Sequence, residues 1–453
     1  MKHTILFSQL FCLFASVILF FAPIAINPYN STDILLFFYV GSAIVLGLSF
    51  VDIYQKRESL LKGISFFNAF ISIFASLIVA IYFYNHKTPL GLSIVLLLLC
   101  LFYGIYKRTF YKPHIIMIII FIFSTIKLLS VLWSNNIKEG FDHIDYYCLF
   151  IFLPIVSCFY KVEKADLKLF IYTVFSIFLG LLILEFISYI FLLKSLNQSF
   201  FAFLSFNKGY LGYMGDQELL AKYYNIILWT KTSHPSKMAW ICMVVGVAGY
   251  WLWQEGEKKI ITTYQLLLYF ATLLIFSFAV QARVAILGIF ILISLFVWVS
   301  LMKQVKKPKL ITLFTVIVFI IGSLITKEII TKTTFFNDEG RVKVNEVALV
   351  HFKEHPFIGG GAGYEVQILQ QLNSNLNKLH NDFLTTLVDQ GLLGLSFLLL
   401  FHVLVIYYGL KNKYFLGIYV LLAFAIFNST EDTMGYPICI PFFLFCLIPP
   451  QQT

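Results

Sequence analysis

The chain has 453 residues, of which 60% are hydrophobic and only 12% are charged. Soluble domains carry roughly a quarter charged residues, so this composition excludes an ordinary soluble protein. The net charge of +10 does not indicate a nucleic-acid partner, because the lysines and arginines lie in short clusters between apolar stretches. We expect a single all-α membrane protein that binds no nucleic acid.

Apolar stretches of membrane-crossing length recur along the whole chain. A crossing helix needs about 20 apolar residues, and the N-terminal stretch is too long for a signal peptide and lacks a small-residue cleavage site. We predict about 12 to 14 transmembrane helices, of which the sixth and the last are short. They are expected near residues 5–27, 33–53, 65–84, 88–106, 115–133, 145–160, 169–194, 237–254, 264–281, 283–301, 309–326, 384–407, 414–429 and 436–449.

Positive charge separates the loops into two sets. Clusters such as Lys56-Arg57 and Lys107-Arg108 fall on one face, and the short loops of the other face carry little positive charge. The positive-inside rule makes the first face cytoplasmic, which places both termini in the cytoplasm. We expect the chain to lie in a bacterial inner membrane, with the long loops in the periplasm if the organism is Gram-negative. The expected organisation is helices in 1–194, an extracytoplasmic loop in 195–236, helices in 237–326, an extracytoplasmic catalytic loop in 327–383 and helices in 384–453.

Two ionisable residues fall inside predicted spans. Glu185 lies deep in its span and Lys127 near the outer end of another. A charge in hydrocarbon is costly and therefore indicates function, although a lysine near a helix end can also extend to the interface. No pair of similar halves of the kind found in transporters is present.

The loop 327–383 carries the residues suited to chemistry. Residues 338–356 have the apolar spacing of an amphipathic helix that ends before Pro356, with Arg341 in its first turn. There Arg341 either binds an anion near the positive helix end or is a solvated surface arginine. The glycines of 359–363 match no phosphate-binding fingerprint and indicate a turn between two helices.

His380 and Asn381 open the helix that re-enters the membrane. A histidine near neutral pKa at this boundary is suited to general-base catalysis, or it simply lies at the start of a helix. Arg283 begins another span on the same face and would form a diphosphate clamp with Arg341 if both face inward. Lys231 and His234 lie on this face too and would extend the basic site, although Pro235 beside them is ordinary at a helix start.

These landmarks resemble the O-antigen ligase and Wzy-type polymerase family of membrane glycosyltransferases over about residues 230–430. Arg283 opens an outer-facing span, Arg341 precedes a Pro-x-x-Gly-x-Gly segment at 356–361, and His380-Asn381 is followed after nine residues by Gly391 and then by Gly394. The resemblance implies a GT-C-like fold and inverting transfer of a glycan from undecaprenyl diphosphate to a lipid A-core hydroxyl on the periplasmic face. It further implies that His380 is the base, that Arg283 and Arg341 bind the diphosphate, with Asn381, His234 and Lys231 in support, and that neither metal nor cofactor takes part.

Other functions stay open at this point. A Wzy-type polymerase uses the same donor with another lipid-linked repeat as glycan acceptor, and a related enzyme would transfer glycan to protein. A transporter or flippase of lipid-linked sugars needs a charged or hydrated path, which the few intramembrane charges disfavour. A structural membrane subunit would tolerate substitution of the basic residues.

Overall fold

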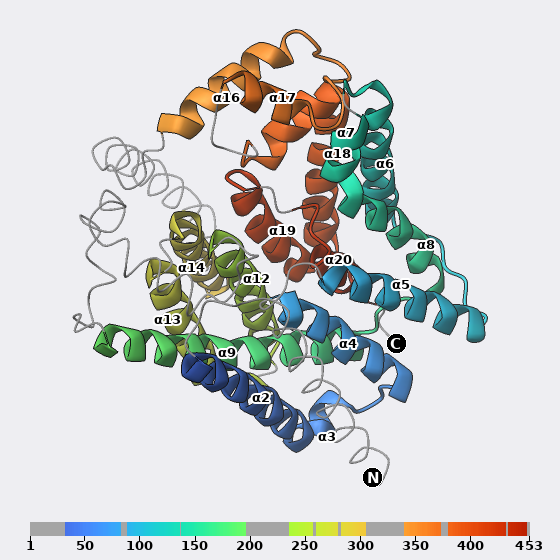
Figure 1. Cartoon of the computed structure of the whole chain (residues 1–453). Coiled ribbons are helices and arrows are strands. Elements are labelled where there is room, and N and C mark those ends of the chain that lie inside the picture. The colour runs from blue at the N-terminus through green and yellow to red at the C-terminus, as the bar shows by residue number, and fades with distance from the viewer. Residues whose placement is uncertain are drawn as a thin grey trace.

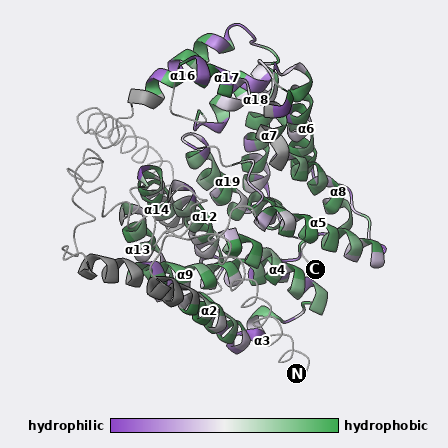
Figure 2. Cartoon of the chain, viewed as in Figure 1, coloured by the Kyte–Doolittle hydropathy of each residue, from purple (hydrophilic) through white to green (hydrophobic). Residues whose placement is uncertain are grey.

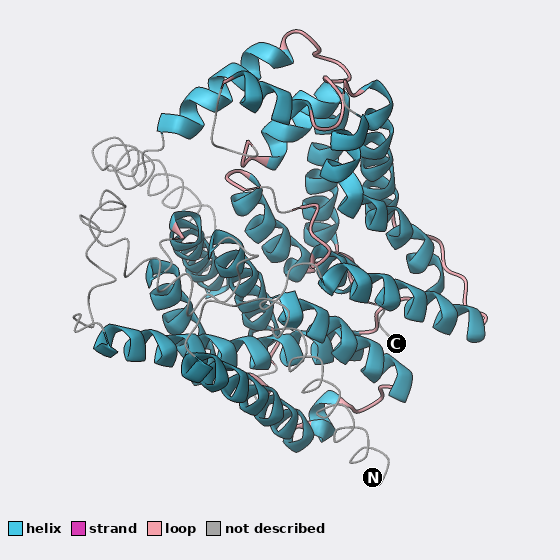
Figure 3. Cartoon of the chain, viewed as in Figure 1, coloured by secondary structure: helices cyan, strands magenta, loops and turns pink. Residues whose placement is uncertain are grey.

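The computed structural model describes most of the chain between its termini. The described residues are 32–82, 88–135, 137–195, 235–256, 260–279, 282–304, 339–372, 379–431 and 434–450. The spans expected near 5–27 and 309–326, and the loop residues Lys231 and His234, lie outside these ranges. Within them, every regular element is a helix (Figure 3), which confirms the all-α class.

The helices follow the predicted apolar stretches closely (Figure 1). They are α2 (Thr32–Gln55), α3 (Arg57–Leu60), α4 (Phe66–Tyr82), α5 (Thr88–Tyr106), α6 (Ile115–Leu129), η1 (Ser130–Trp133), α7 (Ile137–Ile144), η2 (Asp145–Ile151), α8 (Phe152–Phe159), α9 (Lys164–Ser195), α12 (Pro235–Gln254), α13 (Thr263–Ala279), α14 (Arg283–Gln304), α16 (Glu339–Phe352), α17 (Tyr364–Gln371), α18 (Asp382–Lys411), α19 (Phe415–Asn428) and α20 (Cys439–Cys446).

Four described segments are long and apolar enough to cross a membrane, which supports a polytopic membrane protein. They are Thr88–Tyr106, Ile115–Trp133, Lys164–Phe186 and Asp382–Lys411. Figure 2 shows hydrophobic residues along most helices and more hydrophilic ones on α16 and α17. Over the expected short span 145–160, η2 is a 3-10 helix that continues directly into α8, and together they include the apolar helix Tyr147–Phe159, which is shorter than a membrane-crossing helix. At the last expected span, 436–449, the helix is α20, which has only 8 residues, so a crossing there stays a prediction.

The core forms around α9, which packs against α2, α4, α12 and α13. Aromatic side chains fill the contacts between helices, as in the stacked pair Phe170–Phe445, with ring centroids 4.6 Å apart. A second group of helices surrounds α18, which begins directly after the predicted site residues His380 and Asn381. Helix α6 packs against α18, and α18 packs against α19.

The α16–α17 unit, defined as these two helices and the segment 353–363 between them, lies over the N-terminal end of α18 (Figure 1). Val344 and Ala348 of α16 are buried with Ile368 of α17 and Val388 of α18 in a small separate core. Val344 and Ala348 thus lie on the predicted buried face, but Val342, Leu349 and Val350 are exposed, so the apolar residues of α16 are not confined to one face. The helix ends at Phe352, since proline disfavours helical backbone before it.

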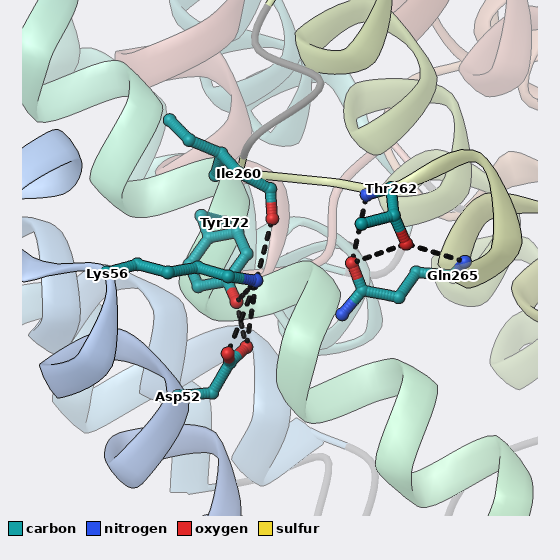
Figure 4. A network of polar contacts seen from close by, with 6 residues as sticks. All are labelled: Asp52, Lys56, Tyr172, Ile260, Thr262 and Gln265. Atoms are coloured by element: carbon teal, nitrogen blue, oxygen red, sulfur yellow. Dashed lines mark hydrogen bonds and ion pairs between the residues drawn. The ribbon is translucent and has the colours of Figure 1, made fainter.

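At the other end of the molecule, a lysine ties three segments together. The Nζ of Lys56, after α2, donates to the Tyr172 hydroxyl on α9 at 2.7 Å and to the Ile260 carbonyl at 2.8 Å (Figure 4). It also pairs with the Asp52 carboxylate at 3.2 Å, to which the Tyr172 hydroxyl donates as well. Lys56 belongs to the positive clusters that predict the orientation of the chain. Its contacts show that it also holds α2, α9 and the segment before α13 together.

Candidate active site

His380 occupies a strained turn directly before α18. Its φ of 55° lies in the left-handed region, which side chains other than glycine seldom adopt. Such backbone conformations persist where surrounding contacts hold them, and they cluster at functional sites. The sequence places a histidine here, but only the structure reveals this backbone conformation.

A carboxylate orients the His380 ring. The Nδ1 atom lies 3.1 Å from Oε2 of Glu431, whose side chain is only 2% exposed, whereas the His380 side chain is 22% exposed. Glu431 follows α19 and is anchored by its backbone N–H, which donates to the Phe427 carbonyl at 2.7 Å. A carboxylate on Nδ1 selects the tautomer in which Nε2 can accept a proton. Nε2 has no hydrogen-bond partner among the described residues.

The residues that follow His380 fix the turn. Asn381 is the N-cap of α18, and its Oδ1 accepts from the Leu384 N–H at 3.0 Å. Asp382 is buried, and its Oδ2 accepts from the Met434 N–H at 2.9 Å. Asn381 therefore acts as a helix cap, and Asp382 joins the turn to the segment before α20.

The first glycine of the signature, Gly391, makes a kink in α18. Its φ of 64° and ψ of −161° are non-helical, and a Cβ there would lie 2.5 Å from the Phe357 carbonyl carbon. Across the kink, the N–H groups of Gly360 and Gly361 donate to the carbonyls of Val388 and Asp389 at 3.0 and 2.9 Å. The glycine run is thus a turn between α16 and α17, as predicted, and it packs directly on the kink.

Two buried carboxylates hold α17 in place below this turn. Asp389 accepts from the N–H groups of Gly363 and Glu365, both at 3.1 Å, so it sits at the positive end of α17. Glu365 accepts in turn from the Leu379 N–H at 3.1 Å and from the Thr385 hydroxyl at 2.8 Å. This chain of bonds connects α17 to the segment that carries His380.

Lys127 is buried inside the protein rather than extended outward, so burial disfavours the interfacial lysine, and a functional role stays a prediction. Its side chain is 4% exposed, and Nζ lies 4.5 Å from the Tyr147 ring centroid and 5.5 Å from that of Phe123. Its charge acts on the buried Asp389. Glu185, the other intramembrane candidate, is also buried, and neither of its carboxylate oxygens has a partner among the described residues.

A side-chain network joins α16 to α17. Oε2 of Glu354 lies 3.1 Å from Nδ1 of His351 and accepts from the Tyr364 hydroxyl at 3.2 Å. The hydrogen bond with His351 lowers the pKa of the exposed Glu354 carboxyl below its usual value. The network helps to position α16, the helix whose third residue is Arg341.

The structure describes the side chain of Arg283 but not that of Arg341, the two arginines predicted for the site. Arg283 is the first residue of α14 and is half-buried. Arg341 is in the first turn of α16, as expected, but its side chain lies outside the described part of the structure. The arginine clamp therefore stays a prediction. Lys237, close to the predicted His234, lies with Nζ 4.4 Å from the ring centroid of Tyr436 and contacts its hydroxyl.

The segment before α20 contacts both Lys237 and the residue after Asn381. Tyr436 lies two residues after Met434, whose N–H is bonded to Asp382 beside His380. Sequence reasoning found His380 and Asn381 but missed Glu431 and Asp382. Among the described residues, no group of three histidines, cysteines or acids is arranged to hold a metal ion.

The fold and this site define a polytopic helical membrane protein in which the half-buried His380 pairs with the buried Glu431 near the α16–α17 unit. Residues 268–399 match the family model described as O-Antigen ligase, which confirms the resemblance drawn from the sequence and supports a ligase- or polymerase-type function in general. The match contains Arg283, Arg341 and His380, whereas Glu431 lies beyond it. Comparison with curated proteins gives no match.

Proposed function

We propose that the protein is an O-antigen ligase-type glycosyltransferase that moves a glycan from undecaprenyl diphosphate to a sugar hydroxyl of lipid A-core. The observation that carries the proposal is the His380–Glu431 pair at 3.1 Å, on the helix turn that bears the ligase signature. Segment 327–383 would then be extracytoplasmic, with the site on the periplasmic face of the inner membrane and both termini in the cytoplasm.

The proposed reaction is a direct displacement. Nε2 of His380 takes the proton from the acceptor hydroxyl, and the hydroxyl oxygen attacks the anomeric carbon of the donor glycan. The bond between that carbon and the diphosphate oxygen breaks, the electron pair leaves with the diphosphate, and the anomeric configuration inverts. Glu431 stabilises the imidazolium that forms, as a buried carboxylate does for other catalytic histidines.

The departing diphosphate gains negative charge in this step. Arg283 and Arg341 are proposed to bind it, because guanidinium groups match phosphate oxygens in bidentate geometry. Lys237 is a further candidate, since it lies against Tyr436 near the His380 turn. Lys231 and His234 remain proposed supporting residues, and Asn381 contributes by capping α18. The proposed reaction uses no metal or cofactor.

A transporter of lipid-linked sugars has less support. Asp389 and Asp382, at the N-terminal end of α18, accept hydrogen bonds from backbone N–H groups. Carboxylates engaged in this way hold the fold together rather than line a hydrated path. The polymerase alternative uses the same donor and the same base, so the acceptor alone separates it from the ligase.

The test is the lipopolysaccharide banding of a deletion strain complemented with wild type or with His380→Ala. We expect wild type to restore a capped ladder and His380→Ala to leave core alone, with lipid-linked polymer accumulating, because loss of a general base costs about 10²- to 10⁴-fold in rate. The matched control is His355→Ala, which removes an exposed histidine of the α16–α17 unit and should leave the ladder intact.

Two other banding patterns would change the assignment. Core with a single repeat would identify a polymerase. An unchanged ladder in the His380→Ala strain, with both variants at equal amounts in the membrane fraction, would overturn the transferase assignment.

A further inference from the structure

A cavity of about 480 Å³ lies at the ends of α6 and α18 that are remote from His380. It is bordered by the segment before α6, the segment after α8, the last turn of α18 and the chain after α20. Its lining residues are Lys112, Pro113, His114, Ile115, Met117, Ser157, Tyr160, Lys161, Val162, Tyr408, Asn412, Leu444, Ile448 and Pro449. We call it the lysine cavity.

The charges that line the cavity are of one sign. Lys112 and Lys161 are exposed, and none of the lining residues is acidic. Neither lysine forms an ion pair with a described residue, and Nζ of Lys161 lies 4.7 Å from the ring centroid of Tyr111. The nearby carboxylates Glu163 and Asp166 act on Tyr160 but do not line the cavity, so the charged groups that face it are ammonium groups, which attract an anion.

His114 contributes a neutral wall rather than a third cation. Its Nδ1 accepts from the Ile116 N–H at 3.3 Å, and its ring packs edge-on against Tyr408 with centroids 4.7 Å apart. Burial, with a smaller contribution from Lys161, lowers the pKa of His114 below its ordinary value of 6.5. The cationic character therefore comes from the two lysines.

Much of the rest of the lining is apolar, and one buried hydroxyl in it lacks a hydrogen-bond partner among the described residues. Met117 and Leu444 are buried beside the cavity, and Ile115 is half exposed. Tyr160 is only 3% exposed, and its hydroxyl has no hydrogen-bond partner among the described residues. A ligand that satisfies this lining has an anionic head that accepts hydrogen bonds and an apolar body.

The position of the cavity separates it from the His380 site. Helix α18 begins two residues after His380, and Tyr408 and Asn412 lie at its far end. After the kink at Gly391, the helix continues to Lys411, and these roughly 20 residues at about 1.5 Å each correspond to about 30 Å, the thickness of the hydrocarbon layer. The two sites are therefore at opposite membrane surfaces.

We propose that the lysine cavity binds the phosphate headgroup of an anionic phospholipid from the leaflet opposite the His380 site. Basic pockets between transmembrane helices are suited to such headgroups, and the acyl chains extend along the exposed apolar side chains of α6 and α18. A free phosphate would leave the apolar part of the lining uncovered.

The test is native mass spectrometry of the full chain released from nanodiscs of phosphatidylcholine mixed with an equal amount of phosphatidylglycerol. Wild type should retain phosphatidylglycerol in preference to phosphatidylcholine. The double variant Lys112→Gln/Lys161→Gln should lose about tenfold of that preference, because each lysine near an anionic headgroup contributes to binding. The matched control Lys62→Gln/Lys107→Gln removes two exposed lysines outside the cavity and should keep the wild-type preference.

Three results would overturn the proposal. They are equal retention of both lipids by wild type, an equal loss in the control pair, and displacement of phosphatidylglycerol by excess inorganic phosphate. The last would assign the cavity to a free phosphate. Both lysines are exposed, so we expect the variants to fold. If a variant does not fold, the lipid preference of the wild-type protein still tests the proposal.

Discussion

The two ends of the α6–α18 pair differ in how they hold charge. At the His380 end, Asp382, Asp389 and Glu431 are buried, and each bonds a backbone N–H or the His380 ring. At the opposite end, Lys112 and Lys161 are exposed beside a cavity and have no ionic partner among the described residues. The first end is held together by hydrogen bonds of buried carboxylates, as the proposed proton transfer would need, whereas the second presents exposed lysines that would attract an external anion.

The two kinds of charged residue therefore have different roles: the buried carboxylates position helices, and the exposed lysines attract anions. Carboxylates that accept two hydrogen bonds, such as Asp389 and Glu365, fix the distance between α17 and α18. Lysines on long flexible stems do not fix geometry, but they attract anionic headgroups near a membrane surface. Substitutions at the His380 end should therefore change rate or stability, whereas those at the cavity should change lipid occupancy.

The largest effect of the remaining tests is expected from Glu431→Gln. The amide has nearly the same shape, but it has no negative charge to stabilise the His380 imidazolium, and it can select the wrong ring tautomer. We expect the transfer rate to fall roughly 100-fold or more, with the thermal unfolding midpoint little changed. The rate is measured with purified protein and lipid-linked donor in vesicles.

The control for this prediction is Glu58→Gln, which removes an exposed carboxylate of α3, outside the proposed site. It should leave the rate within a few-fold of wild type. An equal loss of rate in both variants would show that the effect of Glu431 is not specific to the His380 pair.

The next effect concerns the kink in α18. In Gly391→Ala, the new Cβ would lie 2.5 Å from the Phe357 carbonyl carbon, in a backbone conformation that side chains avoid. We expect a cost of about 2 kcal/mol in the free energy of unfolding. The cost appears as a lower midpoint of thermal unfolding in detergent.

Gly91→Ala is the matched variant, because no atom lies within 4 Å of a Cβ at that position in α5. It should be neutral or slightly stabilising, since alanine favours helix over glycine. If Gly391→Ala proved as stable as Gly91→Ala, the α16–α17 turn would not be locked to the kink.

The sequence predicts those features that depend on neighbours in the chain. The limits of α5 agree with the predicted 88–106, and the opening of α18 at His380-Asn381 follows from local capping and apolar patterns. Glu431 is 51 residues from His380 and meets it only because α19 packs against α18. No periodicity encodes that contact.

The buried position of Lys127 was equally inaccessible to sequence patterns. A lysine near a helix end can extend outward or turn inward, and the choice depends on Tyr147 and Asp389, which come from η2 and α18. The change to a 3-10 helix over η2 also departs from the even apolar pattern of 145–160. In each case tertiary packing decided between conformations that local sequence allowed.

The smallest expected effect compares asparagines at the two ends of α18. Asn381 caps the first turn through the Leu384 N–H, so Asn381→Ala should cost about 1 kcal/mol. Asn412 follows the last turn, and its exposed side chain has no hydrogen bond to a described residue, so Asn412→Ala should stay within about 0.5 kcal/mol of wild type.

Hydrogen exchange of backbone amides separates these two predictions within one helix. The first-turn amides of α18 should exchange roughly fivefold faster in Asn381→Ala, because 1 kcal/mol corresponds to about that factor in the opening equilibrium. The last-turn amides should exchange at the wild-type rate in Asn412→Ala. Faster exchange at both ends would mean that the two ends are equally dependent on side-chain caps, which contradicts a His380 end held together by hydrogen bonds and an open lysine cavity.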